Sequence, residues 1–312
     1  MSAQAGPPVE RLAVRAAVAL TAVTVVWGST FVLVQRLIAT MPVSSFMFWR
    51  FAIAAIALAT VRPRAIAAIA PRERRRGVAI GLVVGVGFAL QTVGLRYTSA
   101  SVSGFVTGMF VVLTPVMSGL LFRERVTASV RWGVALAVAG LAVLSLRGWS
   151  VGFGEVVTLA AAVAFAAQIA MLGQWATSHN AYGVTLVQLG VVALVGAGLT
   201  VLDGGPKLPD SVGAWVGLAF LGLVASALAF TVQTWSQSHL SATRTAVIMT
   251  SEPLWAGIVA VLVAGEPGSV RLLVGGALVL LAMYVAELGP HRTMRPPAPG
   301  ALAVRPSASS AR

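Results

Sequence analysis

The chain has 312 residues, of which 58% are hydrophobic and 10% are charged, and its mean hydropathy is +0.90. A soluble chain averages about 25% charged residues, so this composition excludes an ordinary soluble domain and predicts a membrane protein. The formal net charge of +13 would suggest a nucleic-acid partner in a soluble protein. Here the arginines gather in short links between apolar segments, so we expect no nucleic-acid partner. Cysteine is absent, which excludes disulfides and thiolate chemistry.

Ten apolar segments approach the length of about 20 residues that a membrane-spanning helix needs. In chain order they lie near Ala16–Val34, Ser44–Val61, Gly77–Leu95, Val102–Phe122, Val130–Leu146, Val156–Trp175, Ala181–Leu202, Val212–Trp235, Ala246–Ala264 and Leu272–Ala286. We therefore predict an all-α polytopic membrane protein. Residues 1–15 are expected to form a cytoplasmic N-terminal tail. The basic, Pro- and Ala-rich residues 289–312 are expected to form a disordered cytoplasmic tail.

The distribution of arginine predicts the orientation in the membrane. One link alone, between the second and third segments, carries six arginines: Arg62, Arg64, Arg72, Arg74, Arg75 and Arg76. Because short cytoplasmic loops carry an excess of Lys and Arg, this link should lie inside. Both termini are then cytoplasmic, and the chain is a multi-pass protein of the inner (plasma) membrane.

The chain contains an internal repeat. A series of residues in the first half recurs 142 positions later, namely Phe88, Gln91, Thr92, Ser99, Ala100, Glu124 and Gly133 as Phe230, Gln233, Thr234, Ser241, Ala242, Glu266 and Gly275. Each copy holds five segments, over residues 16–148 and 149–288. An odd number of helices forces the second copy to enter the membrane from the opposite side, so the repeats are inverted, which is typical of alternating-access transporters.

Several motifs identify a family. They are Trp27-Gly28-Ser29-Thr30-Phe31, Arg50, Tyr97-Thr98-Ser99-Ala100, Pro115 with Glu124, Glu252-Pro253 and Gly265-Glu266. With these motifs the chain resembles EamA-type members of the drug/metabolite transporter superfamily. The resemblance implies ten helices in two five-helix repeats and export of a small organic metabolite, amino acid or drug, coupled to protons or to an exchanged solute. The implied partners are a small-molecule substrate and the lipid bilayer, with a homodimer as a further candidate, and no cofactor.

The two copies differ where polar chemistry is concentrated. Glu252-Pro253 aligns with Phe110-Val111, and the proline of the first copy comes one turn later, at Pro115. At a slightly shorter spacing of 138 positions, Arg50 aligns with Gln188 and Trp27 with Phe165. Both Pro115 and Pro253 are predicted to break their helices.

Glu252 and Arg50 are the main candidates for substrate binding or coupling. Glu252 lies eight residues, or about 12 Å, beyond Arg244, near the middle of the bilayer, where ionisable groups are costly and usually functional. Burial favours the neutral form of a carboxyl, which suits proton coupling. Alternatively, Glu252 could bond the backbone that Pro253 frees. Arg50 could bind a substrate carboxylate or phosphate or pair with Glu252, or else snorkel towards the interface or fix helix packing.

Glutamines and tryptophans complete the candidate site. Gln91 and Gln233 are repeat equivalents and, with Gln168, could line a polar cavity or instead bond between helices. Trp27 and Trp255 are cavity candidates that could stack on a substrate.

The acids near helix ends have a structural interpretation. Glu124 and Glu266 precede the fifth and tenth helices, where an acid favours the helix dipole. We expect both to be structural residues.

Two other functional classes remain open. An intramembrane enzyme would need convergent His, Asp, Ser or metal ligands at membrane depth, whereas the histidines fall in loops or the tail, at His179, His239 and His291. We predict no catalytic and no metal-binding residues. A non-transporting membrane scaffold would lack a polar cavity between the two halves.

Overall fold

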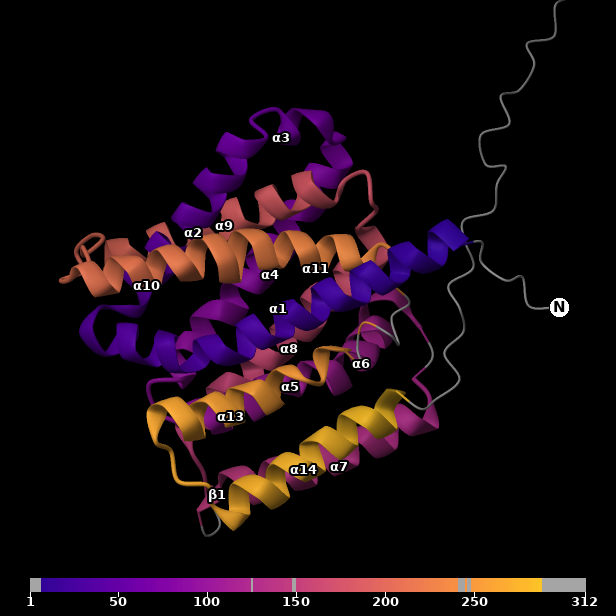
Figure 1. Cartoon of the computed structure of the whole chain (residues 1–312), viewed down its shortest axis with the longest axis vertical. Helices are drawn as coiled ribbons and strands as arrows, with labels where there is room; N and C mark the ends of the chain where they lie inside the picture. Colours follow the sequence, from indigo (N-terminus) through magenta and orange to yellow (C-terminus); the bar gives the residue numbers. More distant parts are fainter. Residues whose placement is uncertain (1–6, 125, 148–149, 241–244, 246–247, 288–312) are drawn as a thin grey trace, which may run out of the picture.

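The computed structural model describes residues 7–124, 126–147, 150–240, 245 and 248–287, and its helices run roughly side by side (Figure 1). Within this part of the chain, seven helices are long and apolar enough to cross a membrane, and three shorter apolar helices occupy the remaining predicted segments. The all-α polytopic fold is therefore confirmed. The 289–312 tail, His291 and Arg244 lie outside the described residues.

The first repeat forms five membrane segments from six helices. They are α1 (Pro7–Thr40), α2 (Val43–Val61), α4 (Pro71–Gly94), α5 (Ala100–Gly108) followed by α6 (Phe110–Phe122), and α7 (Ala128–Ser145). A four-residue helix, α3 (Ala65–Ala68), lies in the arginine-rich link. A short antiparallel ladder, β1 (Leu146–Arg147) with β2 (Ser150–Val151), connects the repeats.

The second repeat follows the same order. It comprises α8 (Phe153–Trp175), α9 (Ala181–Leu202), α10 (Val212–Gly222) continued by the π-helix η1 (Leu223–Leu228) and α11 (Ala229–Gln237), then α13 (Glu252–Ala264) and α14 (Val270–Glu287). The largest difference from the predicted boundaries is at the start of the first helix. The first helix begins at Pro7 rather than Ala16, because Glu10 and Arg11 are good helix formers and a proline is favoured in the first turn.

The fourth membrane segment of each repeat is interrupted at an equivalent position. The first repeat breaks at Met109, between α5 and α6, and the second has a turn at Thr250 and Ser251, directly before α13. Pro253 occupies the first turn of α13, where a missing N–H is harmless. Pro115, in contrast, lies inside α6, six residues after the interruption that we had predicted it to cause. Gly108 packs closely on Pro253 at the break, so α5 and α13 cross there.

The packing of α7 on α14 follows the inverted repeat residue by residue. A Cβ placed on Gly133 would lie 2.7 Å from the Cβ of Ala286, and one placed on Gly275 would lie 2.7 Å from the Cγ of Leu144. Gly275 is the equivalent of Gly133, and Ala286 is the equivalent of Leu144, in each case 142 positions later. The second contact therefore repeats the first with the two helices exchanged. The interface is thus pseudo-two-fold symmetric, and small residues let the two backbones approach. These two helices form one edge of the molecule (Figure 1).

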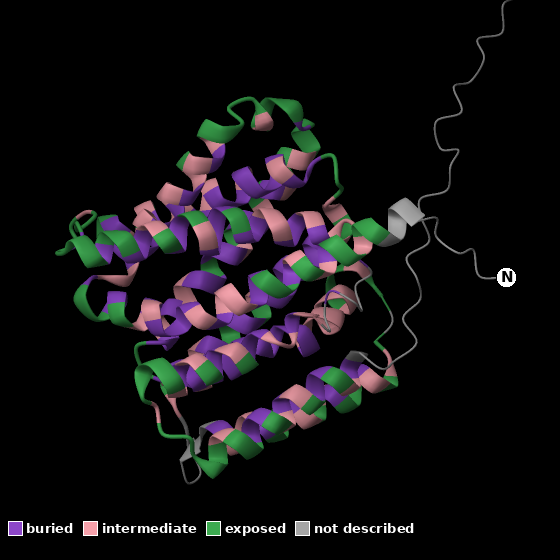
Figure 2. Ribbon diagram, in the orientation of Figure 1, coloured by how far each residue is buried: buried purple, intermediate pink, exposed green. Residues whose placement is uncertain are grey.

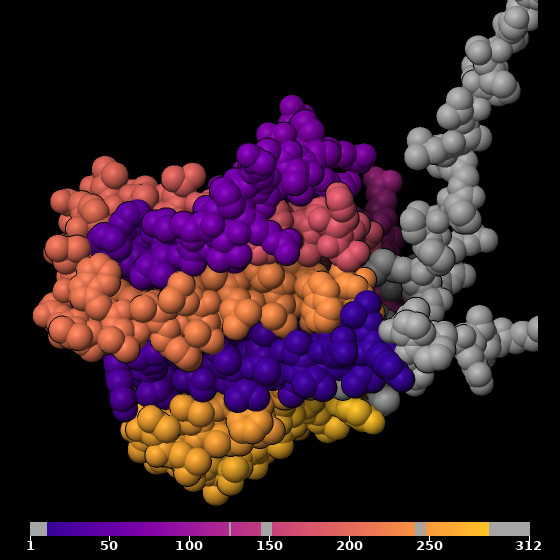
Figure 3. All heavy atoms as spheres, turned by 45° about the horizontal axis from the view of Figure 1, so that its top comes forward, coloured from indigo at the N-terminus to yellow at the C-terminus, as the bar shows by residue number. Residues whose placement is uncertain are grey.

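Buried residues face the interior of the bundle, and exposed residues cover the outer helix faces and the links (Figure 2). Many of the exposed side chains on the helices are large and apolar, among them Ile56, Leu120, Leu194, Leu228 and Leu262. The space-filling view shows α1 as a band across one face, between α10–α11 on one side and α13–α14 on the other (Figure 3). Such an apolar exterior suits lipid rather than water.

Candidate functional site

A cavity of about 630 Å³ lies between the two repeats. Its walls come from α1, α2, α4, α5, α6, α8, α11 and the region of α13, through Trp27, Thr30, Phe31, Val34, Arg50, Phe88, Gln91, Thr92, Leu95, Thr107, Phe110, Phe165, Gln168, Ile169, Phe230, Gln233, Met249 and Glu252. Val34 and Leu95 lie near the ends of α1 and α4 that are opposite the arginine-rich link. We call this space the central cavity.

Four aromatic rings form the core of the central cavity in symmetric pairs. The Trp27 and Phe230 ring centroids are 5.2 Å apart, and those of Phe88 and Phe165 are 5.1 Å apart. Phe165 is the repeat equivalent of Trp27, and Phe230 that of Phe88. A contact of 5.9 Å between Phe88 and Phe230 joins the two pairs. The repeats therefore contribute equally to an apolar, aromatic wall on which an organic group could pack.

The π-helix η1 fixes the orientation of Trp27. The Trp27 Nε1–H donates to the carbonyl oxygen of Ala225, at 2.8 Å, within η1. A π-helical turn departs from the regular α-helical bonding pattern and is often found at functional sites. This bond turns the indole N–H away from the cavity and leaves the ring as a fixed wall.

Arg50 is buried at one side of the central cavity, with 3% of its surface exposed. Its Nε–H donates to Ser226 Oγ at 2.9 Å, and the guanidinium lies 4.9 Å from the ring centroid of Phe88 and 5.1 Å from that of Phe51. Within the described residues Arg50 forms no ion pair, and in particular none with Glu252. Because a buried cation without a counter-charge is costly, this position favours an anionic ligand.

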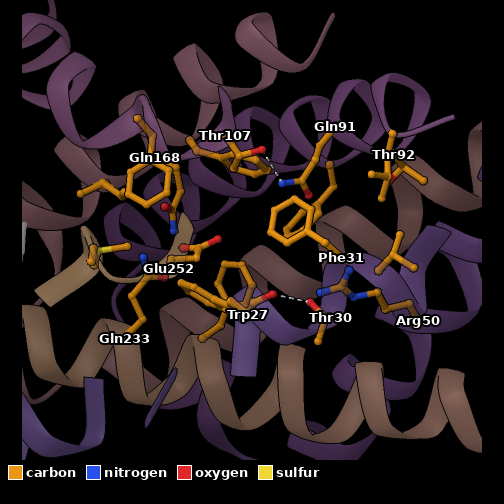
Figure 4. A pocket seen from close by; sticks show the side chains of 18 residues that line it. Trp27, Thr30, Phe31, Arg50, Gln91, Thr92, Thr107, Gln168, Gln233 and Glu252 are labelled. Atoms are coloured by element: carbon orange, nitrogen blue, oxygen red, sulfur yellow. Dashed lines mark hydrogen bonds between the residues drawn. The ribbon is translucent and has the colours of Figure 1, made fainter. Parts of the chain in front are cut away.

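Glu252 lies on the other side of the cavity, together with Gln168 and Gln233 (Figure 4). It is 5% exposed and is the first residue of α13. Three buried atoms here have no hydrogen-bond partner among the described residues, namely Glu252 Oε2, Gln168 Nε2 and Gln233 Oε1. Buried polar atoms are normally satisfied, so this group is available to a ligand or to water.

The two equivalent glutamines have different surroundings. Gln91 Nε2 donates to Thr107 Oγ1 at 3.1 Å. The residue equivalent to Thr107 in the second repeat is Met249, whose thioether is a weak acceptor. The polar half of the site is thus asymmetric, although the aromatic wall is symmetric.

Six of the seven predicted substrate or coupling residues line the central cavity: Trp27, Arg50, Gln91, Gln168, Gln233 and Glu252. Trp255 does not line it; its Cβ packs against Gly28 of α1, at the crossing with α13. Sequence reasoning missed Ser226 and the four-ring wall, although the recurrence of Phe88 as Phe230 was a usable signal.

Glu266 has a structural position that differs from the predicted one. Its carboxylate accepts the backbone N–H groups of Ala100 and Ser101, at 2.8 and 3.2 Å. The acid therefore caps α5 in the other repeat rather than α14, and it joins the two repeats at that end. Glu124 accepts a bond of 2.6 Å from Gln174 Nε2.

The fold and the cavity define a polytopic membrane protein with two inverted five-helix repeats around a central site. Comparison with known families agrees: residues 14–146 and 152–287 each match the EamA-like transporter family. The chain belongs to this family of membrane transporters.

Individual relatives agree with this membership. An uncharacterized transporter of Archaeoglobus fulgidus is 30% identical, covering 86% of this chain and 84% of the relative. A probable terminal-alkyne amino-acid exporter of Streptantibioticus cattleyicolor is 26% identical, covering 83% of this chain and 89% of that protein. A crystal structure of a protein 19% identical to this chain aligns with a TM-score of 0.60, covering 86% of this chain and 96% of that one, which shows likeness of fold alone.

Proposed function

We propose that the protein exports a small organic solute that carries a carboxylate, such as an amino acid, across the inner (plasma) membrane by alternating access. The single observation that carries this proposal is Arg50, a buried guanidinium that lines the central cavity with no ion-pair partner within the described residues. Arginine matches a carboxylate geometrically, because its donors form a planar fork.

The other walls of the cavity suit the rest of such a solute. The aromatic rings of Trp27, Phe88, Phe165 and Phe230 would pack on an apolar side chain. Glu252 Oε2 and Gln233 Oε1, which have no partner among the described residues, would accept hydrogen bonds from an ammonium group. The name of the Streptantibioticus relative, a probable exporter of an amino acid, supports the same solute class.

Proton coupling is the second part of the proposal. Arg50 and Glu252 are the two ionisable residues among those that line the central cavity. A carboxyl buried without a partner exchanges between neutral and charged forms when a cation or water reaches it. Glu252 would then carry the proton in exchange for the solute, with both termini and the arginine-rich link in the cytoplasm.

The experiment measures binding to the purified protein by thermal stabilisation. The common amino acids are screened, and every ligand that binds is compared with its carboxamide. The acid should bind the native protein more tightly than the carboxamide. Arg50→Gln should weaken binding of the acid by about tenfold to hundredfold, since a hydrogen bond to a charged group contributes about 1.5–3 kcal/mol.

The matched control is Arg131→Gln, which removes an exposed arginine on α7 and should leave binding unchanged. Arg50→Lys keeps the charge but loses the fork, so binding of the acid should fall to an intermediate level. If Arg50→Gln weakened binding of the acid and binding of the carboxamide equally, the assignment of Arg50 to the solute carboxylate would be wrong.

A further inference from the structure

A second cavity, of about 620 Å³, adjoins the central one. Its lining residues are Phe110, Val111, Thr114, Ser118, Glu124, Ile169, Ala170, Gly173, Gln174, Gln237, Leu240, Thr245 and Met249. They come from α6 and the residues just after it, from the second half of α8, from the end of α11 and from the segment between α11 and α13. The ends of α6, α8 and α11 lie at the same side of the molecule. These are the ends nearest the arginine-rich link, because Asn180, which follows α8, bonds Glu73 at the start of α4. We call this space the second cavity.

Three residues line both cavities: Phe110, Ile169 and Met249. Their exposed fractions are 4%, 9% and 1%, and none of the three side chains can form a strong hydrogen bond. Between two partly polar spaces they form an apolar partition. Beyond it, the second cavity offers hydroxyl, amide and carboxylate groups through Thr114, Ser118, Glu124 and others, as a hydrated vestibule would.

The inverted repeat assigns an equivalent to each residue of this partition. Phe110 corresponds to Glu252 and Met249 to Thr107, at 142 positions, and Ile169 corresponds to Phe31, at the 138 positions that relate Trp27 to Phe165. All three equivalents line the central cavity and none lines the second one. In this structure they border the central cavity alone, whereas their counterparts lie between the two cavities.

From this pairing, and resting on the proposed transport function, we infer that the second cavity is the cytoplasmic end of the solute path. Phe110, Ile169 and Met249 form its closed barrier, and Phe31, Thr107 and Glu252 form the barrier that closes the opposite end in the alternate state. Exchange of the conformations of two inverted repeats would convert one state into the other.

The second barrier differs chemically from the first, since it contains a carboxyl where the first has Phe110. Closing it would remove Glu252 from the cavity, and burying an unpaired carboxylate is costly. Arg50 is the other charged group that lines the cavity. Closure therefore requires Glu252 to be neutral or to hold a cationic group, which would link the return step to the coupling ion.

The absence of cysteine allows a direct test, because an introduced cysteine is the sole thiol. Ser118→Cys reports on the second cavity and Val34→Cys on the central one. Both are labelled in sealed vesicles with a membrane-impermeant maleimide, applied to one side at a time and without any solute. In the conformation described here, Ser118→Cys should react only from the side of the arginine-rich link, and Val34→Cys only from the other side.

Widening the partition should remove this sidedness. In the Ser118→Cys background, Met249→Ala or Ile169→Ala should allow labelling from both sides. From the side opposite the arginine-rich link, labelling should be at least tenfold faster than in Ser118→Cys alone. Val111→Ala is the matched control, since Val111 lines the second cavity alone, and it should preserve the sidedness. Labelling of Ser118→Cys from both sides without any change in the partition would overturn the assignment.

The second barrier is tested by a Phe31→Cys/Thr107→Cys pair. A short thiol cross-linker should join the two only in molecules that have left the present state, and the joined protein should lose solute flux and regain it on cleavage of the linker. Cross-linking that leaves flux intact would overturn this part. None of the labelling needs a bound solute, so its failure would leave the Arg50 proposal standing, and a failed Arg50 test would leave the barriers standing.

Discussion

At the scale of single residues, Arg123 and Gly265 show how the repeats share a backbone but not a sequence. Arg123 ends α6 with φ 59° and ψ 30°, and Gly265 ends α13 with φ 68° and ψ 24°. They are equivalent positions, and both hold the left-handed conformation of a helix C-cap. Glycine adopts it freely, whereas a residue with a Cβ is strained by about 1–2 kcal/mol. The first repeat therefore carries backbone strain that the second does not.

Arg123→Gly should stabilise the protein by about 1 kcal/mol, because glycine relieves the strain and Arg123 is exposed. The measurement is the thermal unfolding midpoint in detergent. Gly265→Ala should lower the midpoint, since nothing but backbone strain opposes a Cβ there. An unchanged or lower midpoint for Arg123→Gly would show that the strain is relieved in another way.

Glu252 is the residue at which a pH response should originate. In proteoliposomes, a proton gradient should accelerate solute flux by the native protein, and Glu252→Gln should abolish that acceleration, because glutamine cannot exchange a proton. Asp210→Asn, in the exposed link after α9, is the control and should respond like the native protein. Flux by Glu252→Gln that followed the gradient as before would exclude Glu252 as the coupling group.

At the scale of elements, the crossing of α1 and α13 depends on Gly28. A Cβ at this position would lie 2.5 Å from the carbonyl oxygen of Glu252, 2.6 Å from the Cβ of Trp255 and 2.9 Å from the backbone nitrogen of Ala256. Such contacts with backbone atoms cannot be relieved by a side-chain rotation. The crossing also positions Trp27 and Glu252, the neighbours of this contact, in the central cavity. Close packing and the site therefore share one interface.

Gly28→Ala should push α13 away from α1, lower the thermal midpoint by several degrees and reduce solute flux. Gly190→Ala, on α9, is the matched control: a Cβ there meets nothing within 4 Å, so alanine should raise stability by up to about 1 kcal/mol through helix propensity. A midpoint for Gly28→Ala equal to that of Gly190→Ala would mean that the two helices are not in close contact in the membrane.

At the scale of the whole molecule, two inverted repeats share an aromatic wall and differ in the charges placed on it. In the proposed alternating-access cycle, a symmetric wall would give the two states similar packing energies. Arg50 and Glu252 have no charged equivalents, since Gln188 and Phe110 occupy the corresponding positions. In the proposed function this asymmetry would give the solute and the coupling ion separate binding groups. Alternating access of this kind requires the two repeats to lie in opposite orientations in the membrane.

Two cysteine variants test that orientation. Arg64→Cys lies in the arginine-rich link and Asp210→Cys in the corresponding link of the second repeat, and both positions are exposed. An impermeant thiol reagent should label Arg64→Cys only from the cytoplasmic side and Asp210→Cys only from the opposite side. Labelling of both from the same side would contradict the inverted arrangement.

The sequence by itself determined the number of apolar segments, the repeat and six of the residues that line the central cavity. Hydropathy reflects the free energy of transferring side chains from water into lipid, so it identifies the membrane segments directly. The recurrence at 142 positions pairs equivalent residues without any knowledge of packing. Gln91 and Gln233 were found in this way. The polar and charged candidates Arg50, Gln168 and Glu252 were found because such groups are rare in a membrane segment.

Only the tertiary structure decided which helix faces meet. These helices are apolar on all sides, and lipid is as apolar as a protein core, so no amphipathic stripe marks the buried face. For this reason the sequence could not separate Trp27, which lines the cavity, from Trp255, which packs beside Gly28. It also could not show that Glu266 caps α5, or that Arg50 and Glu252 line one cavity without pairing, since both depend on contacts between distant segments.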